Sequence, residues 1–206
     1  MTKKNKGYTM IEMIIVIAIM AILSGMAFVT LGIIQQAKCN AAATSLDSQI
    51  GSLWIKTKAL SQGKTQTVAT SSEKGAKYPL SMLIRKNDDA SDDIRDGSYV
   101  IYLGYSDGSS FYEKERCEVL PNVVSLKYTP TPGKDAEQKV TTLSMLVHTD
   151  GSSETIATGE TDGFLISFNK SDGSVNHGAG TYEIIYNDET IVSIYLDSIT
   201  GNHYAK

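Results

Sequence analysis

The chain has 206 residues, a formal net charge of −4 and two cysteines. This length is enough for one domain with a hydrophobic core of its own. The acidic balance argues against binding to DNA or RNA, because nucleic-acid-binding proteins usually carry a basic face, and the C-terminal segment TGNHYAK offers a single lysine.

The first predicted element is a membrane-spanning helix. From Met13 to Ile34 the chain has no charged residue and no proline, and the run is long enough for a transmembrane helix, which needs about 20 residues. Lys3, Lys4 and Lys6 precede it without any acid, which predicts that the N-terminus stays in the cytoplasm and that the chain after Gln35 lies outside. A cleavable secretory signal is the alternative, but its hydrophobic part is usually about 7 to 15 residues long.

Glu12 lies at the beginning of this apolar run. A charged side chain inside a membrane costs roughly 2.5 to 3.5 kcal/mol on insertion scales, so an unpaired carboxylate would weaken the segment. Either Glu12 has a partner, or its side chain reaches water at the membrane interface without one.

The string KGYTMIEMIIVIAIMAIL resembles the class III signal of type IV prepilins and type II secretion pseudopilins, in which a short basic leader ends in glycine before a long apolar helix. The resemblance implies that a prepilin peptidase cuts after Gly7 and methylates the new N-terminus, Tyr8. Residues 1–7 would then be the leader, and residues 8–34 the transmembrane and assembly helix. Val29 stands where many major subunits have a helix-breaking proline, which favours a minor subunit.

In filaments of this family the helices form a dry bundle, and the glutamate at the position of Glu12 pairs with the amino group of a neighbouring subunit. Such a charge pair is favourable only when both partners are held closely, so Glu12 would mark the register between subunits. The implied partners are a prepilin peptidase, other pilin or pseudopilin subunits, the inner assembly machinery and, before assembly, membrane lipid. The implied location is the cytoplasmic membrane, followed by a cell-surface filament.

The helix is expected to continue beyond the membrane. Four apolar residues and one threonine recur at spacings of three and four, which predicts an amphipathic helix that packs on a core. They are Leu46, Ile50, Leu53, Thr57 and Leu60, with Trp54 beside them. A single helix is predicted from about Tyr8 to Ser61, with residues 35–62 belonging to the head and Gly63 ending it.

Residues 63–206 are predicted to form a β-rich globular head. Its strand-like runs are SYVIYLGY, CEVL, VVSLKY, LSMLVH, FLISF, YEIIY and TIVSIYL. Asp-Gly pairs at positions 107, 150, 162 and 172 predict hairpin turns, and the prolines of YTPTPGKD predict a loop rather than a central strand. One long helix followed by a meandering antiparallel sheet makes the predicted fold α+β and pilin-like.

A second resemblance concerns the head. The segments ALSQGKTQTVATS, FLISFNKSDGSV and TIVSIYLDSITGNHY follow one another in a layout similar to that of the H-type minor pseudopilins and related minor pilins. Their heads end in a strand, a turn with glycine and a short last strand. This resemblance also favours a minor subunit.

No motif predicts catalysis, a metal or a cofactor. Cys39 and Cys117 are placed outside the cytoplasm, where a disulfide is permitted, but free thiols are the main expectation because the two residues belong to distant elements. The histidines, His148, His177 and His203, have no metal-ligand spacing and are expected at the surface or in loops. The Asp-Gly-Ser segments lack the alternating acids of an EF-hand-like calcium loop and are expected to be turns.

The expected function is therefore that of a minor structural subunit of a type IV pilus or of a type II secretion-like pseudopilus. One alternative is a permanently membrane-anchored extracellular binding domain that does not polymerise and keeps its leader. The other is an anchored exoenzyme, which would need a cleft with convergent polar groups. The sequence is equally compatible with pilus, secretion and DNA-uptake machinery.

Overall fold

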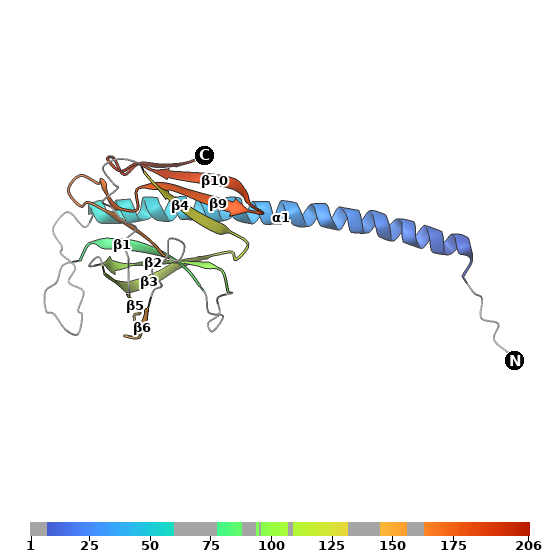
Figure 1. Ribbon diagram of the computed structural model, residues 1–206, viewed down its shortest axis with the longest axis horizontal. Helices are drawn as coiled ribbons and strands as arrows, with labels where there is room; N and C mark the ends of the chain where they lie inside the picture. Colours follow the sequence, from blue (N-terminus) through green and yellow to red (C-terminus); the bar gives the residue numbers. More distant parts are fainter. Residues whose placement is uncertain are drawn as a thin grey trace. The chain divides into compact units, whose positions relative to one another are not determined.

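The computed structural model describes residues 8–59, 78–87, 94, 96–106, 109–131, 145–155 and 163–206. These residues form one long helix and eleven strands (Figure 1), which confirms the α+β prediction. The chain divides into two compact units, Met1–Ala37 and Lys38–Lys206. The second unit is the head, and it contains all the strands.

Helix α1 extends over Met10–Ala59. This confirms the predicted single helix, while the predicted end at Ser61 and Gly63 lies outside the described residues. Lys56 and Lys58 occupy the last turn, where a positive charge stabilises the helix because it opposes the negative end of the helix dipole.

The strands of the head form two sheets. A seven-stranded sheet has the order β6-β5-β3-β2-β1-β7-β8, and a four-stranded sheet has the order β11-β10-β9-β4. The strands of the first sheet are β1 (Leu80–Lys86), β2 (Tyr99–Ser106), β3 (Ser110–Leu120), β5 (Met145–Val147), β6 (Ser153–Thr155), β7 (Gly163–Phe168) and β8 (Val175–His177). Those of the second are β4 (Ser125–Pro130), β9 (Gly180–Tyr186), β10 (Glu189–Leu196) and β11 (His203–Ala205).

The sheets are not the simple meander that the sequence predicts. Strand β7 returns to pair with β1, β4 pairs with β9 in the other sheet, and β3 and β5 run parallel to each other. Strand β1, with the sequence LSMLIRK, is missing from the predicted strands although it is paired on both sides. Its leucines and methionine have no strong strand propensity, so its place in the sheet comes from burial rather than from local preference.

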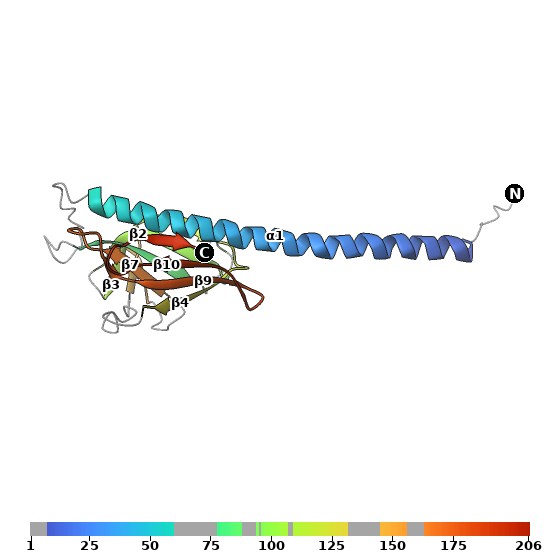
Figure 2. The same ribbon diagram turned by 90° about the horizontal axis from the view of Figure 1, so that it is seen from above.

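The apolar stripe of α1 forms the main core of the head, as predicted. Leu46 and Ile50 are fully buried and Leu53 is 1% exposed, and Figure 2 shows this part of α1 lying along the sheets. The same core contains Met82, Ile84, Ile101, Leu103 and Ile166 of the seven-stranded sheet, and Tyr182, Ile184, Ile194 and Leu196 of the four-stranded sheet. The predicted stripe residue Leu60 lies outside the described residues.

The opposite face of the seven-stranded sheet is also buried. Alternate residues of its strands point to this second core, which contains Leu83, Val100, Tyr102, Phe111, Leu146 and Leu165 together with Ile94. Only glycine fits at position 104, because a Cβ there would clash with its neighbours: it would lie 2.1 Å from Tyr112 O and 2.7 Å from the Phe111 ring. The central strands are therefore apolar on both faces.

Polar contacts hold both flanks of α1. On one side Ser45 donates a hydrogen bond to Glu118 of β3, and Lys56 lies 3.4 Å from Glu115 of the same strand. On the other side Trp54 Nε1 donates to Gly173 O at 3.2 Å. The helix is thus fixed between β3 and the turn that follows β7.

Two of the predicted Asp-Gly turns are confirmed. Gly151 lies in the turn between β5 and β6, and Gly173 in the turn between β7 and β8, with φ values of 87° and 85° that favour glycine. The pair at position 107 and Asp162 lie outside the described residues, and Gly163 is instead the first residue of β7.

The segment predicted as a proline-rich loop begins as a strand. Tyr128–Pro130 belong to β4, and the rest of the segment after Thr131 lies outside the described residues. Strand β4 is at the edge of its sheet. The missing backbone N–H of Pro130 therefore does not remove a hydrogen bond from the middle of the sheet. The predicted closing arrangement of strand, glycine turn and short last strand corresponds to β10, Gly201 and β11.

The packing of α1 can be tested with two isoleucines that are five residues apart. Replacing Ile50 with alanine should destabilise the head by about 2 to 5 kcal/mol, because a fully buried side chain leaves a cavity. Ile55→Ala is the matched control and should cost less than about 0.5 kcal/mol, since Ile55 is 62% exposed. Denaturant unfolding of the full chain in detergent micelles, followed by Trp54 fluorescence, measures the free energy of unfolding of each variant. Equal decreases in the two variants would contradict this packing.

Candidate functional site

The N-terminus of α1 has a capping box formed by Thr9 and Glu12. The Thr9 backbone N–H donates to Glu12 Oε2 at 2.7 Å, and the Thr9 hydroxyl donates to the same oxygen at 2.9 Å. In return, Glu12 N donates to Thr9 Oγ1 at 3.3 Å. These reciprocal bonds satisfy backbone donors that a helix start leaves without partners.

This arrangement gives Glu12 a partner within its own chain, which neither sequence-based alternative included. The hydrogen bonds that the described residues make to the carboxylate go to Oε2, so Oε1 stays available to a second group. A carboxylate in the first turn also stabilises the positive end of the helix dipole. The signal was present in the sequence as Thr-x-x-Glu immediately before an apolar run, which is the usual spacing of a capping box.

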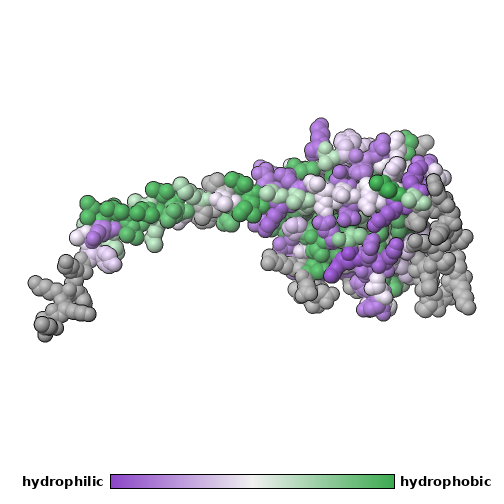
Figure 3. Space-filling model, turned by 180° about the vertical axis from the view of Figure 1, so that it is seen from behind, coloured by the Kyte–Doolittle hydropathy of each residue, from purple (hydrophilic) through white to green (hydrophobic). Residues whose placement is uncertain are grey.

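The apolar part of α1 exposes its side chains all around the helix. Between Met10 and Ile34 the large hydrophobic side chains outside residues 27–29, whose side chains are not described, are 45% to 85% exposed, and Figure 3 shows hydrophobic residues over most of the visible face of this segment. Within the described part of the chain, α1 is the helix that is long and apolar enough to cross a membrane, and its most apolar stretch is not buried. A soluble core helix would instead be mostly buried.

The two hydroxyl groups in this stretch are satisfied within the helix. Ser24 Oγ donates to Met20 O at 2.7 Å, and Thr30 Oγ1 donates to Met26 O at 2.9 Å. Because a hydroxyl without a partner is costly in hydrocarbon, these bonds make the segment compatible with lipid or with a dry helix bundle.

The residues predicted for processing lie next to this cap. Gly7 is outside the described residues, and Tyr8 is 83% exposed immediately before Thr9. The structure therefore places Tyr8 and Glu12 at the same end of α1.

The two cysteines are free thiols. Cys39 is fully buried on α1, and Cys117 lies on β3, partly buried against the same core. Burial raises the pKa of the Cys39 thiol; burial and then the nearby Glu115 raise the pKa of the Cys117 thiol. Both are therefore weakly reactive, packed side chains, and the disulfide alternative is not present in this structure.

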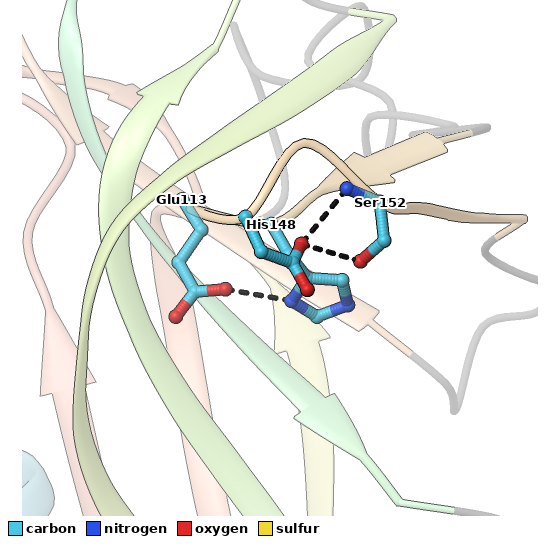
Figure 4. A network of polar contacts seen from close by, with 4 residues as sticks. Glu113, His148 and Ser152 are labelled. Carbon is cyan, nitrogen blue, oxygen red and sulfur yellow. Dashed lines mark hydrogen bonds and ion pairs between the residues drawn. The ribbon is translucent and has the colours of Figure 1, made fainter.

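The expectation of surface or loop histidines holds for His148, which follows β5 in the connection to β6, whereas His177 and His203 lie on strands β8 and β11. All three histidines are partly buried, and each has a polar contact. His148 Nδ1 lies 2.7 Å from Glu113 Oε2, whose side chain is 10% exposed (Figure 4). This contact directly follows the short β3–β5 pairing, which ends at Tyr112 and Val147, and so it extends the attachment of β5 to β3.

A serine completes this network without making a catalytic arrangement. Asp150 Oδ1 accepts from the Ser152 hydroxyl at 2.6 Å and from Ser152 N at 2.8 Å (Figure 4), and these bonds lower the pKa of Asp150. A serine nucleophile would need its hydroxyl bonded to the histidine, whereas this hydroxyl donates to the carboxylate. The network therefore supports a structural role in holding the β5–β6 turn.

The Asp-Gly-Ser segments that the structure describes are turns. Asp172 Oδ1 accepts from Ser174 in the same way as Asp150 accepts from Ser152. Among the described residues, no three His, Cys, Asp or Glu side chains form a group that could hold a metal ion.

The family model of the prokaryotic N-terminal methylation motif matches residues 2–28. Neither the curated proteins nor the solved structures gave a match. The motif supports the class of type IV pilins and pseudopilins, and it points to a prepilin-like precursor from a family of structural, non-enzymatic subunits. A precursor of this class is processed by a prepilin peptidase and assembles with other subunits, and its apolar helix fits a single-pass membrane anchor.

The capping box can be tested by separating its two halves. Thr9→Ser and Glu12→Gln should keep the cap, because serine and glutamine have the required groups. Thr9→Val and Glu12→Leu should lose it and speed amide exchange in the first turn by about fivefold, the equivalent of about 1 kcal/mol. Amide exchange measured by NMR in detergent micelles reports this difference. Equal exchange rates in the serine and valine variants would show that no cap forms in the membrane-like environment.

Proposed function

We propose that this protein is a minor structural subunit of a type IV pilus or of a type II secretion-like pseudopilus. The main support for this proposal is the methylation motif at residues 2–28, which begins before α1 and includes the first part of this helix, where apolar side chains are exposed. In this proposal residues 1–7 are a leader removed after Gly7, and Tyr8 becomes the N-methylated first residue. Residues 8–34 form the assembly helix, and residues 35–62 and 63–206 form the head.

Glu12 is proposed to pair with the amino group of Tyr8 in a neighbouring subunit. The capping bonds to Oε2 support this role, because they restrict the side chain and leave Oε1 unoccupied. In a dry helix bundle a buried ammonium without a counter-charge would be strongly unfavourable. The pair therefore favours one axial position of an incoming helix over the others.

The basic leader and the apolar helix support an orientation with the N-terminus inside. Lys3, Lys4 and Lys6 precede the helix without any acidic residue, and such a basic flank is retained in the cytoplasm. The head would then lie outside the cytoplasmic membrane, and it would reach the cell surface after assembly. Membrane lipid surrounds the helix before assembly, and the inner assembly machinery moves it into the filament.

A minor role is supported by two sequence features. Val29 stands at a position where many major subunits have proline, and the order of strand, glycine turn and short last strand at the end of the head is similar to that of the H-type minor pseudopilins. A permanently anchored binding domain that does not polymerise is the alternative. It would keep its leader and would not depend on the charge of Glu12.

Processing can be tested at the scissile bond. Mature protein isolated from native membranes should begin at Tyr8, with a methylated amino group, as shown by mass spectrometry of its N-terminal peptide. Gly7→Leu should leave the chain uncut but still in the membrane, because the apolar helix is unchanged. Native protein that begins at Met1 or Thr2 would contradict the proposal and would favour the anchored alternative.

Assembly can be tested by separating the charge of Glu12 from its capping role. Glu12→Gln keeps the capping box but removes the charge, so cleavage and membrane level should stay normal while incorporation into sheared filaments falls at least tenfold. Thr9→Ser is the matched control with both functions intact and should incorporate normally. Normal incorporation of Glu12→Gln, with no wild-type subunit present, would mean that the charge of Glu12 is not needed for assembly.

A further inference from the structure

The chain passes from the seven-stranded sheet to the four-stranded sheet between β8 and β9. Val175 N of β8 donates to Ser198 O, in the turn after β10, at 2.9 Å. Ala179 O accepts from the Tyr128 hydroxyl of β4 at 2.6 Å and from Thr131 N at 3.3 Å. The two sheets have no strand pair in common among the described residues. The Val175–Ser198 bond therefore links β8 directly to the four-stranded sheet, and the Ala179 bonds attach the connection to β4.

His177 is the last residue of β8, directly before this connection. Its Nδ1 is 2.8 Å from the hydroxyl of Ser167, the residue opposite it on β7, and 3.2 Å from Nδ2 of Asn176. Which group donates depends on the tautomer of the ring. The tautomer that fits both contacts has Nδ1 as the acceptor, because an amide nitrogen can only donate, and the neutral ring then carries its proton on Nε2. Ser167 itself is fully buried.

Protonation of His177 would remove this acceptor. The proton on Nδ1 would face the Asn176 amide hydrogens, and a Ser167 hydroxyl turned to accept it would leave its own hydrogen without a partner in a buried position. The two groups that contact Nδ1 are uncharged: Ser167 belongs to β7 and Asn176 to β8. On the side of β9, the phenol of Tyr182 donates to the carbonyl oxygen of Gly178, the residue after His177, at 2.6 Å. No carboxylate among these groups is placed to stabilise an imidazolium.

We propose that the β8–β9 connection is an acid-sensitive joint between the two sheets of the head, with His177 as the group that binds the proton. At neutral pH the neutral ring holds β8 on β7 through Ser167. At acidic pH the imidazolium favours an opened state in which β8 separates from β7 and the ring reaches water.

The direction of the pH dependence follows from burial. Burial lowers the pKa of His177 below its ordinary value of 6.5. The opened state, with the ring in water, therefore binds the proton at a higher pH than the closed state does. The stabilisation of the closed state is fully present above about pH 6.5 and is lost as the pH falls through the lower pKa of the closed state.

Hydrogen exchange of the full chain in detergent micelles tests this joint. Between pH 7.5 and 5, protection factors for peptides covering β7 and β8 should fall by up to about tenfold per pH unit, the limit for uptake of one proton. Protection factors already correct for the intrinsic pH dependence of exchange. Peptides from β2 and β3 in the same sheet should keep their protection over this range.

Two variants assign the effect to His177. His177→Gln can still accept a hydrogen bond but does not titrate, so the pH dependence should disappear even if the absolute protection is lower. His203→Gln changes another partly buried histidine of the head and should leave the pH dependence intact. The proposal is overturned if β8 protection does not change with pH, if it changes equally in His177→Gln, or if NMR titration places His177 protonation at or above pH 6.5.

Discussion

The contact on which the head depends is the apolar stripe of α1. Leu46, Ile50 and Leu53 have essentially no exposure, and they share one core with strands of both sheets. Because these two sheets have no strand pair in common among the described residues, the helix supplies apolar surface that brings them together. Removing that surface from water is the largest favourable contribution available to such an arrangement. The polar contacts on the flanks of the helix then fix its position.

The same helix has a different physical task in each half. In the head its stripe is covered by strands, while between Met10 and Ile34 the described large apolar side chains are exposed. The second pattern is unfavourable in water and favourable in lipid or among other apolar helices. Glu12 is the exception in this segment, and the capping bonds with Thr9 reduce the cost of its charge without occupying both oxygens. A single side chain can therefore stabilise the helix start and remain able to bind a cation.

Two polar contacts in the described part of the head attach short strands to their neighbours. Glu113 and His148 extend the short pairing of β3 with β5, and Ser167 and His177 connect β7 with β8. In both places a histidine supports a strand pair of only two or three residues. Such short pairs have few backbone hydrogen bonds, so a side-chain contact contributes a larger share of their stability.

The sequence by itself determined the features that depend on local spacing. The Gly7, Tyr8 and Glu12 pattern, the long helix and its stripe all follow from fixed offsets along the chain, and the Thr9–Glu12 cap could have been read in the same way. The order of the strands, the central place of β1 and the contacts of His148 and His177 were decided only by the tertiary structure. These features join residues far apart in the chain or between separate strands, and their partners are selected by burial on both faces of a sheet. That selection depends on the whole packed core, whereas a local pattern depends only on its neighbours in sequence.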